Sequence, residues 1–246
     1  HKTVGSLTQS SVLLMHTNMF TREDVQKSLN IINTTSPSSL LMASIDAARS
    51  YMASDAGSKA MEETYKLAAY ARKGIAKIPG FINDDREHFL AHGSYDYDES
   101  KLVIGLDHLD IDGFQLYHLL KEKYDVQMEL AETYAVLGIF AIGTKKVHVD
   151  HLLAALKDIS KDHYHPDITY PDHHFDNHFP YQLLRPRVAF AAPGKVVPVE
   201  ECDGKISKEQ VMMYPPGIPL IVPGEVWSKE LVEKVKHYES IGITLL

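Results

Sequence analysis

The stretch KLVIGLDHLDIDGFQLYHLLKEKY, residues 101–124, carries the strongest folding signal in the chain. Residues 102–106 (LVIGL) are an apolar run with branched side chains, which is typical of a buried strand. Residues 113–124 place apolar side chains at helical spacing and predict an amphipathic helix. A strand followed by a helix is the repeating unit of a layered α/β structure. We therefore expect an α/β fold around this stretch.

The alternation continues toward the C-terminus. Residues 125–130 and 136–142 predict two more strands, which pair with the first in a compact sheet. Thr144 is expected to cap a helix with apolar residues at helical spacing, namely Val149, Leu152, Leu153, Leu156 and Ile159. From residue 198 onward the chain is β-like and interrupted by prolines, and a short helix is expected over about 228–240.

Toward the N-terminus, the apolar run Val12–Met15 predicts a strand of the kind that parallel sheets bury on both faces. Such a strand needs neighbours that residues 1–78 do not provide, so this region is not expected to form a closed domain. It should be a helical arm whose apolar face is exposed or covered by a partner chain. Thr21 is expected to cap the first helix, with Asp24 at the third position. Two further helices are expected at residues 40–53 and 59–77, with a break at 54–58.

Composition excludes several classes of protein. The chain has 246 residues, 44% of them hydrophobic, which is enough for a substantial core. A net charge of -8 argues against a nucleic-acid partner. The single cysteine, Cys202, excludes an internal disulfide framework and fits a reducing compartment. No apolar run approaches the ~20 residues of a membrane span, and no signal-peptide pattern is present, so we expect a cytoplasmic protein without a membrane partner.

The first residue is His1, not methionine. We therefore expect a processed product, a partial sequence or a fragment, and favour the last two.

Four segments in order carry a family resemblance. They are HKTVGSLTQSSVLL (residues 1–14), TTSPSSLLMASIDAAR (34–49), KLVIGLDHLDIDGFQLYHLLKEKYDVQMEL (101–130) and YPPGIPLIVPGEVW (214–227). Together they resemble the pyridoxal-phosphate-dependent Orn/Lys/Arg decarboxylases of fold type I, beginning at the cofactor-attachment His-Lys pair. The shorter arginine/lysine decarboxylases of the Gram-positive type are the most similar.

The resemblance implies the end of an aspartate-aminotransferase-like cofactor domain at residues 1–78. A small α/β domain at 79–160 and a proline-edged β/α decarboxylase domain at 161–246 would follow. It implies decarboxylation of arginine, lysine or ornithine to the amine and CO2, a lyase reaction of polyamine biosynthesis. The intact enzyme would be a homodimer or higher oligomer. The pyridinium-pairing aspartate, the stacking histidine and the phosphate-binding loop would lie upstream of His1, so the chain alone is expected to be inactive.

The resemblance also implies the site residues. Lys2 would be the Schiff-base lysine and His1 its neighbour on the phosphate side, whereas spacing alone also fits a solvated lysine. Thr35 and Ser36, with Thr34, would approach the cofactor phosphate across a dimer interface, or would simply form the loop that caps the next helix.

An acidic run surrounds the cysteine. Glu201, with Glu200, is a candidate carboxylate for the distal cation of a basic substrate, the alternative being a surface turn before Gly204. The same negative charge should raise the pKa of Cys202, which argues against a thiolate nucleophile.

Residues 161–181 are rich in histidine and aspartate. The side chains that metals favour here are His163, His165, His173, His174, His178, Asp162, Asp167, Asp172 and Asp176. The segment lacks a helical HExxH or paired cysteines, so we expect a solvated loop and no metal site. Asp110 and Asp112 before Gly113 suggest a calcium loop. Such a loop is excluded because its first position would be His108 and its twelfth, which requires a glutamate, is Leu119.

Two readings compete with the enzyme. One is a non-catalytic α/β module, or a subunit that completes a site with a separate N-terminal chain. The other is a His-rich metal-binding domain.

Overall fold

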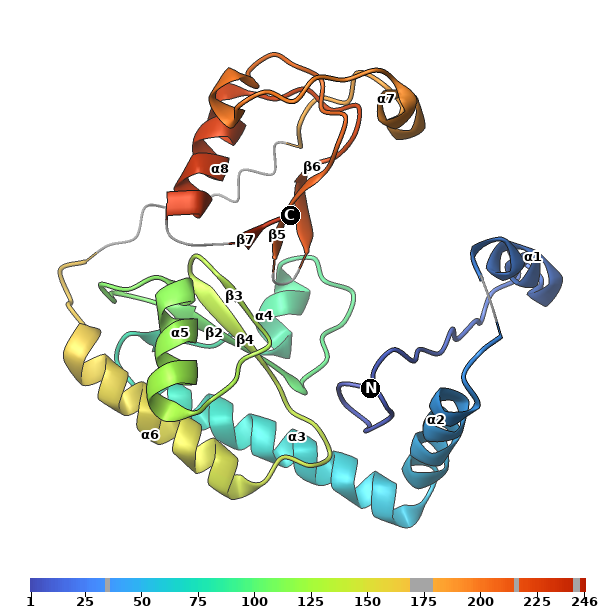
Figure 1. Ribbon diagram of the computed structural model, residues 1–246. Coiled ribbons are helices and arrows are strands. Elements are labelled where there is room, and N and C mark those ends of the chain that lie inside the picture. Colours follow the sequence, from blue (N-terminus) through green and yellow to red (C-terminus); the bar gives the residue numbers. More distant parts are fainter. Residues whose placement is uncertain (34–35, 169–178, 215–216, 241–243) are drawn as a thin grey trace. The chain divides into compact units, whose positions relative to one another are not determined.

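The computed structural model describes residues 1–33, 36–168, 179–214, 217–240 and 244–246 (Figure 1). The chain divides into two compact units, His1–Thr169 and Tyr170–Leu246. The proposed domain limits after residues 78 and 160 stay predictions.

The first unit is built on a four-stranded antiparallel sheet. Its order is β1 (Phe81–Ile82), β2 (Lys101–Leu106), β4 (Ala135–Ile139) and β3 (Leu130–Glu132). Side chains of β2 alternate between buried and half-buried, because successive residues of a strand point to opposite faces. Leu102 and Ile104 are fully buried. The strand predicted at 102–106 is confirmed.

Two of the strand predictions need correction. The strand expected at 125–130 begins only at Leu130, since Asp125 adopts the left-handed conformation (φ 53°) that ends the preceding helix. The strand expected at 136–142 ends at Ile139, and a turn follows. Pairing with β4 therefore defines a shorter β3 than hydrophobicity indicates.

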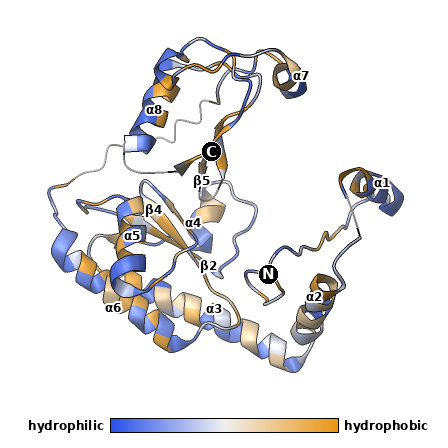
Figure 2. Cartoon of the chain, viewed as in Figure 1, coloured by the Kyte–Doolittle hydropathy of each residue, from blue (hydrophilic) through white to orange (hydrophobic). Residues whose placement is uncertain are grey.

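Three helices bury their apolar faces in this unit: α3 (Asp55–Ile75), α5 (Gly113–Tyr124) and α6 (Lys146–His163). α3 packs against α6 and β2, and α5 packs against β3 and β4. Figure 2 shows hydrophobic residues along β2 and β4 and a mixture of hydrophobic and hydrophilic residues on α5 and α6. The predicted α/β class is confirmed for the sheet and its helices.

The start of α6 differs from expectation. Thr144 is not the N-cap, which is Lys145. The Thr144 hydroxyl instead accepts a hydrogen bond from the backbone N–H of Ala141 at 3.0 Å and closes the turn before the helix. The helix itself is confirmed.

The N-terminal part of the unit contains α1 (Arg22–Ile32) and α2 (Ser39–Met52). The predicted Thr21 cap is confirmed by a capping box with Asp24. The expected break at 54–58 is shorter, because α3 starts at Asp55 with Ser54 as its N-cap. Gly57 lies in the first turn of α3, where an added Cβ would come within 2.1 Å of the Tyr51 carbonyl oxygen, so glycine permits the close approach of α2.

The run Val12–Met15 is not a strand, contrary to expectation. No strand pairs with it among the described residues, and its side chains range from 44% to 87% exposed. An apolar run forms a strand only when a partner satisfies its backbone. These exposed apolar side chains match the exposed helical arm that was expected, whereas α3, also within residues 1–78, buries its apolar face against α6 and β2 and is not part of such an arm. The sequence reasoning also missed β1 and the short helix α4 (Arg86–Ala91).

The second unit has its own sheet and core. Antiparallel strands run in the order β6 (Ile218–Ile221), β5 (Val211–Tyr214) and β7 (Thr244–Leu245). The unit also contains α7 (Pro186–Ala191), a 3-10 helix at Val199–Glu201 and α8 (Lys229–Ser240), which confirms the predicted terminal helix. Its core consists of Cys202, Ile221, Trp227, Val232 and Val235. Among the described helices, none has the length and hydrophobicity that crossing a membrane requires.

Candidate functional site

Lys2 lies in a turn near the start of the first unit. Its ammonium forms an ion pair with the carboxylate of Glu129, a residue 127 positions later in the chain. The Lys2 side chain is 55% exposed and that of Glu129 is 28% exposed. Glu129 directly precedes β3, and its backbone N–H donates to the Leu137 carbonyl of β4 at 2.8 Å.

Two further contacts anchor the segment that carries Lys2. The backbone N–H of Ile142 donates to the carbonyl of Thr3 at 3.3 Å, and the backbone N–H of Leu7 donates to the Ser44 hydroxyl at 3.2 Å. Gly5 adopts φ +85°, a conformation that favours glycine. Residues 2–7 therefore contact the turn after β4 and helix α2.

The other predicted site residues are not gathered around Lys2. His1 and Ser36 are exposed, and within the described parts of the chain no hydrogen bond or ion pair joins either of them to Lys2. Thr35, like Thr34, lies outside the described residues. Glu201 is an exposed residue of the second unit, at the end of its 3-10 helix. Its assignment to the substrate stays a prediction.

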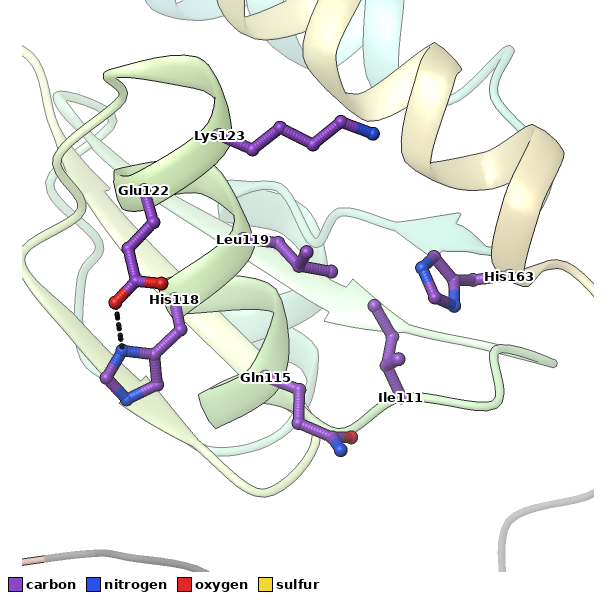
Figure 3. A pocket seen from close by; sticks show the side chains of 7 residues that line it. All are labelled: Ile111, Gln115, His118, Leu119, Glu122, Lys123 and His163. Carbon is purple, nitrogen blue, oxygen red and sulfur yellow. Dashed lines mark ion pairs between the residues drawn. The ribbon is translucent and has the colours of Figure 1, made fainter.

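Lys2 lines neither of two cavities that lie among the described residues of the first unit. The first, of about 510 Å³, lies along α5 and the end of α6 (Figure 3) and is lined by Ile111, Gln115, His118, Leu119, Glu122, Lys123 and His163. The second, of about 390 Å³, is lined by Asp125, Val126, Gln127, Val147, His148 and His151. In Figure 3, Leu119 and Ile111 point toward His163, and His118 pairs with Glu122 on the outer side of α5.

The Lys2 amine fits the covalent attachment of an aldehyde cofactor such as pyridoxal phosphate. It is a primary amine, it is accessible, and the backbone on either side of it is anchored. A phosphate needs several N–H groups or cations arranged together. Neither cavity offers such a cradle next to Lys2. Lys2 therefore fits the attachment point of such a cofactor, and neither of these two cavities fits its phosphate.

The carboxylate of Asp110 accepts hydrogen bonds from two histidines. The sequence had suggested Asp110 only as part of a calcium loop. His163 Nδ1 donates to Asp110 Oδ1 at 2.7 Å, and His165 Nε2 donates to Asp110 Oδ2 at 3.2 Å. The hydrogen bond from His163 is the main cause that holds the pKa of Asp110 below its ordinary value. The backbone N–H of Asp110 also donates to the carbonyl of His163 at 3.1 Å. This cluster fixes the end of α6 to the loop before α5.

Within the described ranges, no group of three or more His, Cys, Asp or Glu side chains is arranged to hold a metal ion. The remaining members of the predicted cluster, His173, His174, His178, Asp172 and Asp176, lie outside those ranges. The expectation of no metal site stays a prediction.

Cys202 is buried in the core of the second unit. Burial is the main cause that raises the pKa of its thiol, and the neighbouring Glu200 and Glu201 raise it further. The predicted direction is confirmed, although the sequence analysis named only the charges.

Two family descriptions match the chain. "Orn/Lys/Arg decarboxylase, major domain" matches residues 1–102, and "Orn/Lys/Arg decarboxylase, C-terminal domain" matches residues 173–242. The chain is 36% identical over 236 residues to an arginine decarboxylase of Bacillus subtilis, covering 96% of this chain and 48% of that protein. It is 34% identical over 244 residues to the arginine decarboxylase of Halalkalibacterium halodurans, covering 99% and 50%. The chain thus spans about half the length of the curated relatives it matches.

Solved structures share the fold. The constitutive lysine decarboxylase of Escherichia coli superposes with a TM-score of 0.67 at 17% identity, covering 93% of this chain and 44% of that one. The lysine decarboxylase of Francisella novicida gives a TM-score of 0.69 at 20% identity, covering 92% and 42%. The two family descriptions together match more than half of the chain, the relatives agree with them, and the chain belongs to the Orn/Lys/Arg decarboxylase family.

Proposed function

We propose that this chain is the C-terminal part of a pyridoxal-phosphate-dependent enzyme that removes the α-carboxylate of a basic amino acid as CO2. The observation that carries the proposal is the 36% identity to an arginine decarboxylase over 96% of the chain. Arginine, lysine and ornithine are the candidate substrates, and the intact enzyme is proposed to be a homodimer or higher oligomer.

In this proposal Lys2 is the covalent attachment point of the cofactor. When bound, pyridoxal phosphate supplies the electron sink that loss of a carboxylate from an amino acid requires. The anchoring of Thr3 by Ile142 fixes the backbone next to Lys2, so the amine is presented from a defined position. His1, Thr35 and Ser36 are proposed partners of the cofactor phosphate.

Glu201 is the proposed partner of the distal cation of the substrate. It is an exposed carboxylate, and a carboxylate forms charge-assisted hydrogen bonds with a guanidinium or an ammonium. A Glu201→Gln variant of the active enzyme should therefore raise KM for the basic amino acid more than it lowers kcat, since the distal group takes no part in bond cleavage.

The test uses the longest natural polypeptide that contains this chain. Amine release from arginine, lysine and ornithine should be abolished by Lys2→Ala and unaffected by Lys27→Ala, which removes an exposed lysine of α1 paired with Asp24 at 3.6 Å. Borohydride reduction in the presence of pyridoxal phosphate, followed by peptide mapping, should place the cofactor on Lys2. A reduced cofactor on another lysine, or full activity of the Lys2→Ala variant, would contradict the proposal. The 246-residue chain by itself should bind pyridoxal phosphate only weakly and release no amine.

A further inference from the structure

Strand β4 arranges both sides of the contact around Lys2. Leu137 of β4 accepts the backbone hydrogen bond of Glu129, and Leu130 pairs with Leu137 in the ladder. The turn after the same strand brings Ile142 to the carbonyl of Thr3. One strand therefore positions the carboxylate and also holds the backbone next to the amine.

We infer that Glu129 is the positioning residue of Lys2: its carboxylate holds the side-chain amine whenever that amine is not covalently engaged. The inference rests on the proposed function, in which Lys2 carries the cofactor. Substrate binding frees the Lys2 amine in that function, and a freed ammonium needs a carboxylate partner that keeps it beside the reacting atoms. Glu129 is the carboxylate in contact with it.

The position of Glu129 separates this role from recognition of the distal end of the substrate. The α-amine of a substrate takes the place of the Lys2 amine, so a group in contact with the Lys2 amine faces the reacting end. The guanidinium carbon of an extended arginine lies six bonds from its own α-amine, which is about 7 Å end to end for a staggered chain with bonds of about 1.5 Å. Glu129 therefore acts on the amine and leaves the distal cation to another carboxylate.

The expected effect is modest in size because the pair is partly exposed. Exposed ion pairs contribute little free energy, and solvent ions screen them. The role of Glu129 is thus to limit where the amine lies and what can reach it. Chemical reactivity of the amine is the property to measure, since global stability would barely change.

The experiment is short-pulse acetylation of the 246-residue chain, with each lysine followed by peptide mass spectrometry. Glu129→Gln should increase the acetylation rate of Lys2 by about two- to five-fold, the range expected for loss of an exposed ion pair. Glu129→Asp should give an intermediate rate, because the charge remains on a shorter side chain. High salt should accelerate Lys2 acetylation in the wild type and have little further effect in Glu129→Gln.

The matched control is Glu62→Gln, which breaks the exposed pair between Glu62 and Lys66 at 2.7 Å on α3. It should accelerate acetylation of Lys66 and leave that of Lys2 unchanged. Glu129→Gln should accelerate acetylation of Lys2 and leave that of Lys66 unchanged. Unchanged Lys2 reactivity in a folded Glu129→Gln chain, with Lys66 responding in the control, would overturn the role of Glu129. A reduced cofactor on a different lysine would instead remove the proposed function, so the two failures are distinguishable.

Discussion

Replacing Gly113 with alanine should loosen α5 from the sheet. Gly113 is the first residue of α5 and is buried against the turn between β3 and β4, where its N–H donates to the Thr133 carbonyl at 2.8 Å. An added Cβ would lie 2.0 Å from the carbonyl oxygen of Glu132 and 2.7 Å from that of Ala135. Both neighbours are backbone atoms, so no side-chain rotation can relieve the contact.

The magnitude follows from that geometry. The helix or the turn must move by roughly 1.4 Å to restore ordinary van der Waals contact at 3.4 Å. Overpacking costs about 1–3 kcal/mol, and a contact against backbone belongs at the upper end. Alanine returns up to about 1 kcal/mol through its higher helix propensity. We expect a net loss of about 2 kcal/mol, a large part of the 5–15 kcal/mol by which domains are stable.

The assay is urea unfolding followed by hydrogen exchange of β2 and β4 peptides, which reports on the first unit alone. With a slope of about 2 kcal/mol per molar urea, the midpoint should fall by about 1 M. Gly143→Ala is the control, because no atom lies within 4 Å of its added Cβ and its φ is not in the left-handed region. Equal midpoints for the Gly113 and Gly143 variants would refute the packing argument.

Two further predictions follow from titratable groups. Asp110→Asn should lower the free energy of unfolding at neutral pH by about 0.5–1 kcal/mol, a value reduced by solvent screening because the Asp110 side chain is 42% exposed. Since the pKa of Asp110 is lowered in the folded state, its contribution is complete above the unfolded value of about 3.9 and is lost as the pH falls through the folded value. Denaturation midpoints of the variant and the wild type should therefore converge in acid, and a difference that persists at the lowest pH would contradict this. Cys202 should react with iodoacetamide much more slowly in the folded chain than in urea, since burial raises the pKa of its thiol; equal rates would show that the thiol is accessible.

Local signals predicted much of the fold. The bounds of α5 were predicted from apolar residues that recur at helical spacing, and the structure adds a capping box between Asp112 and Gln115 at its start. The strand expected at 125–130 was misplaced because hydrophobicity does not reveal the left-handed conformation of Asp125. The Val12–Met15 strand was wrong because an apolar run carries no information about whether a partner strand exists.

The candidate site was less accessible from sequence. A motif resemblance made Lys2 a candidate, but the ion pair with Glu129 joins residues 127 positions apart. The contacts of Asp110 are also long-range, since its two histidine partners lie 53 and 55 positions away. Long-range contacts of this kind depend on how β4 and α6 pack, and no periodicity or spacing in the chain encodes them. Glu129 lies between the buried Met128 and the first residue of β3. A charged residue at such a place was the one feature of the sequence that could have pointed to Glu129 as a site residue.

The separation between Lys2 and its partner also has a consequence for biosynthesis. Lys2 is translated before Glu129 and Ile142, yet its position depends on both. At about 5–20 residues per second, the ribosome needs roughly 6–25 s to add the intervening 127 residues. During that time the nascent lysine has neither its carboxylate nor the neighbouring backbone anchor. A nascent chain would therefore acquire an ordered segment around Lys2 only after β3 and β4 had been synthesised and paired.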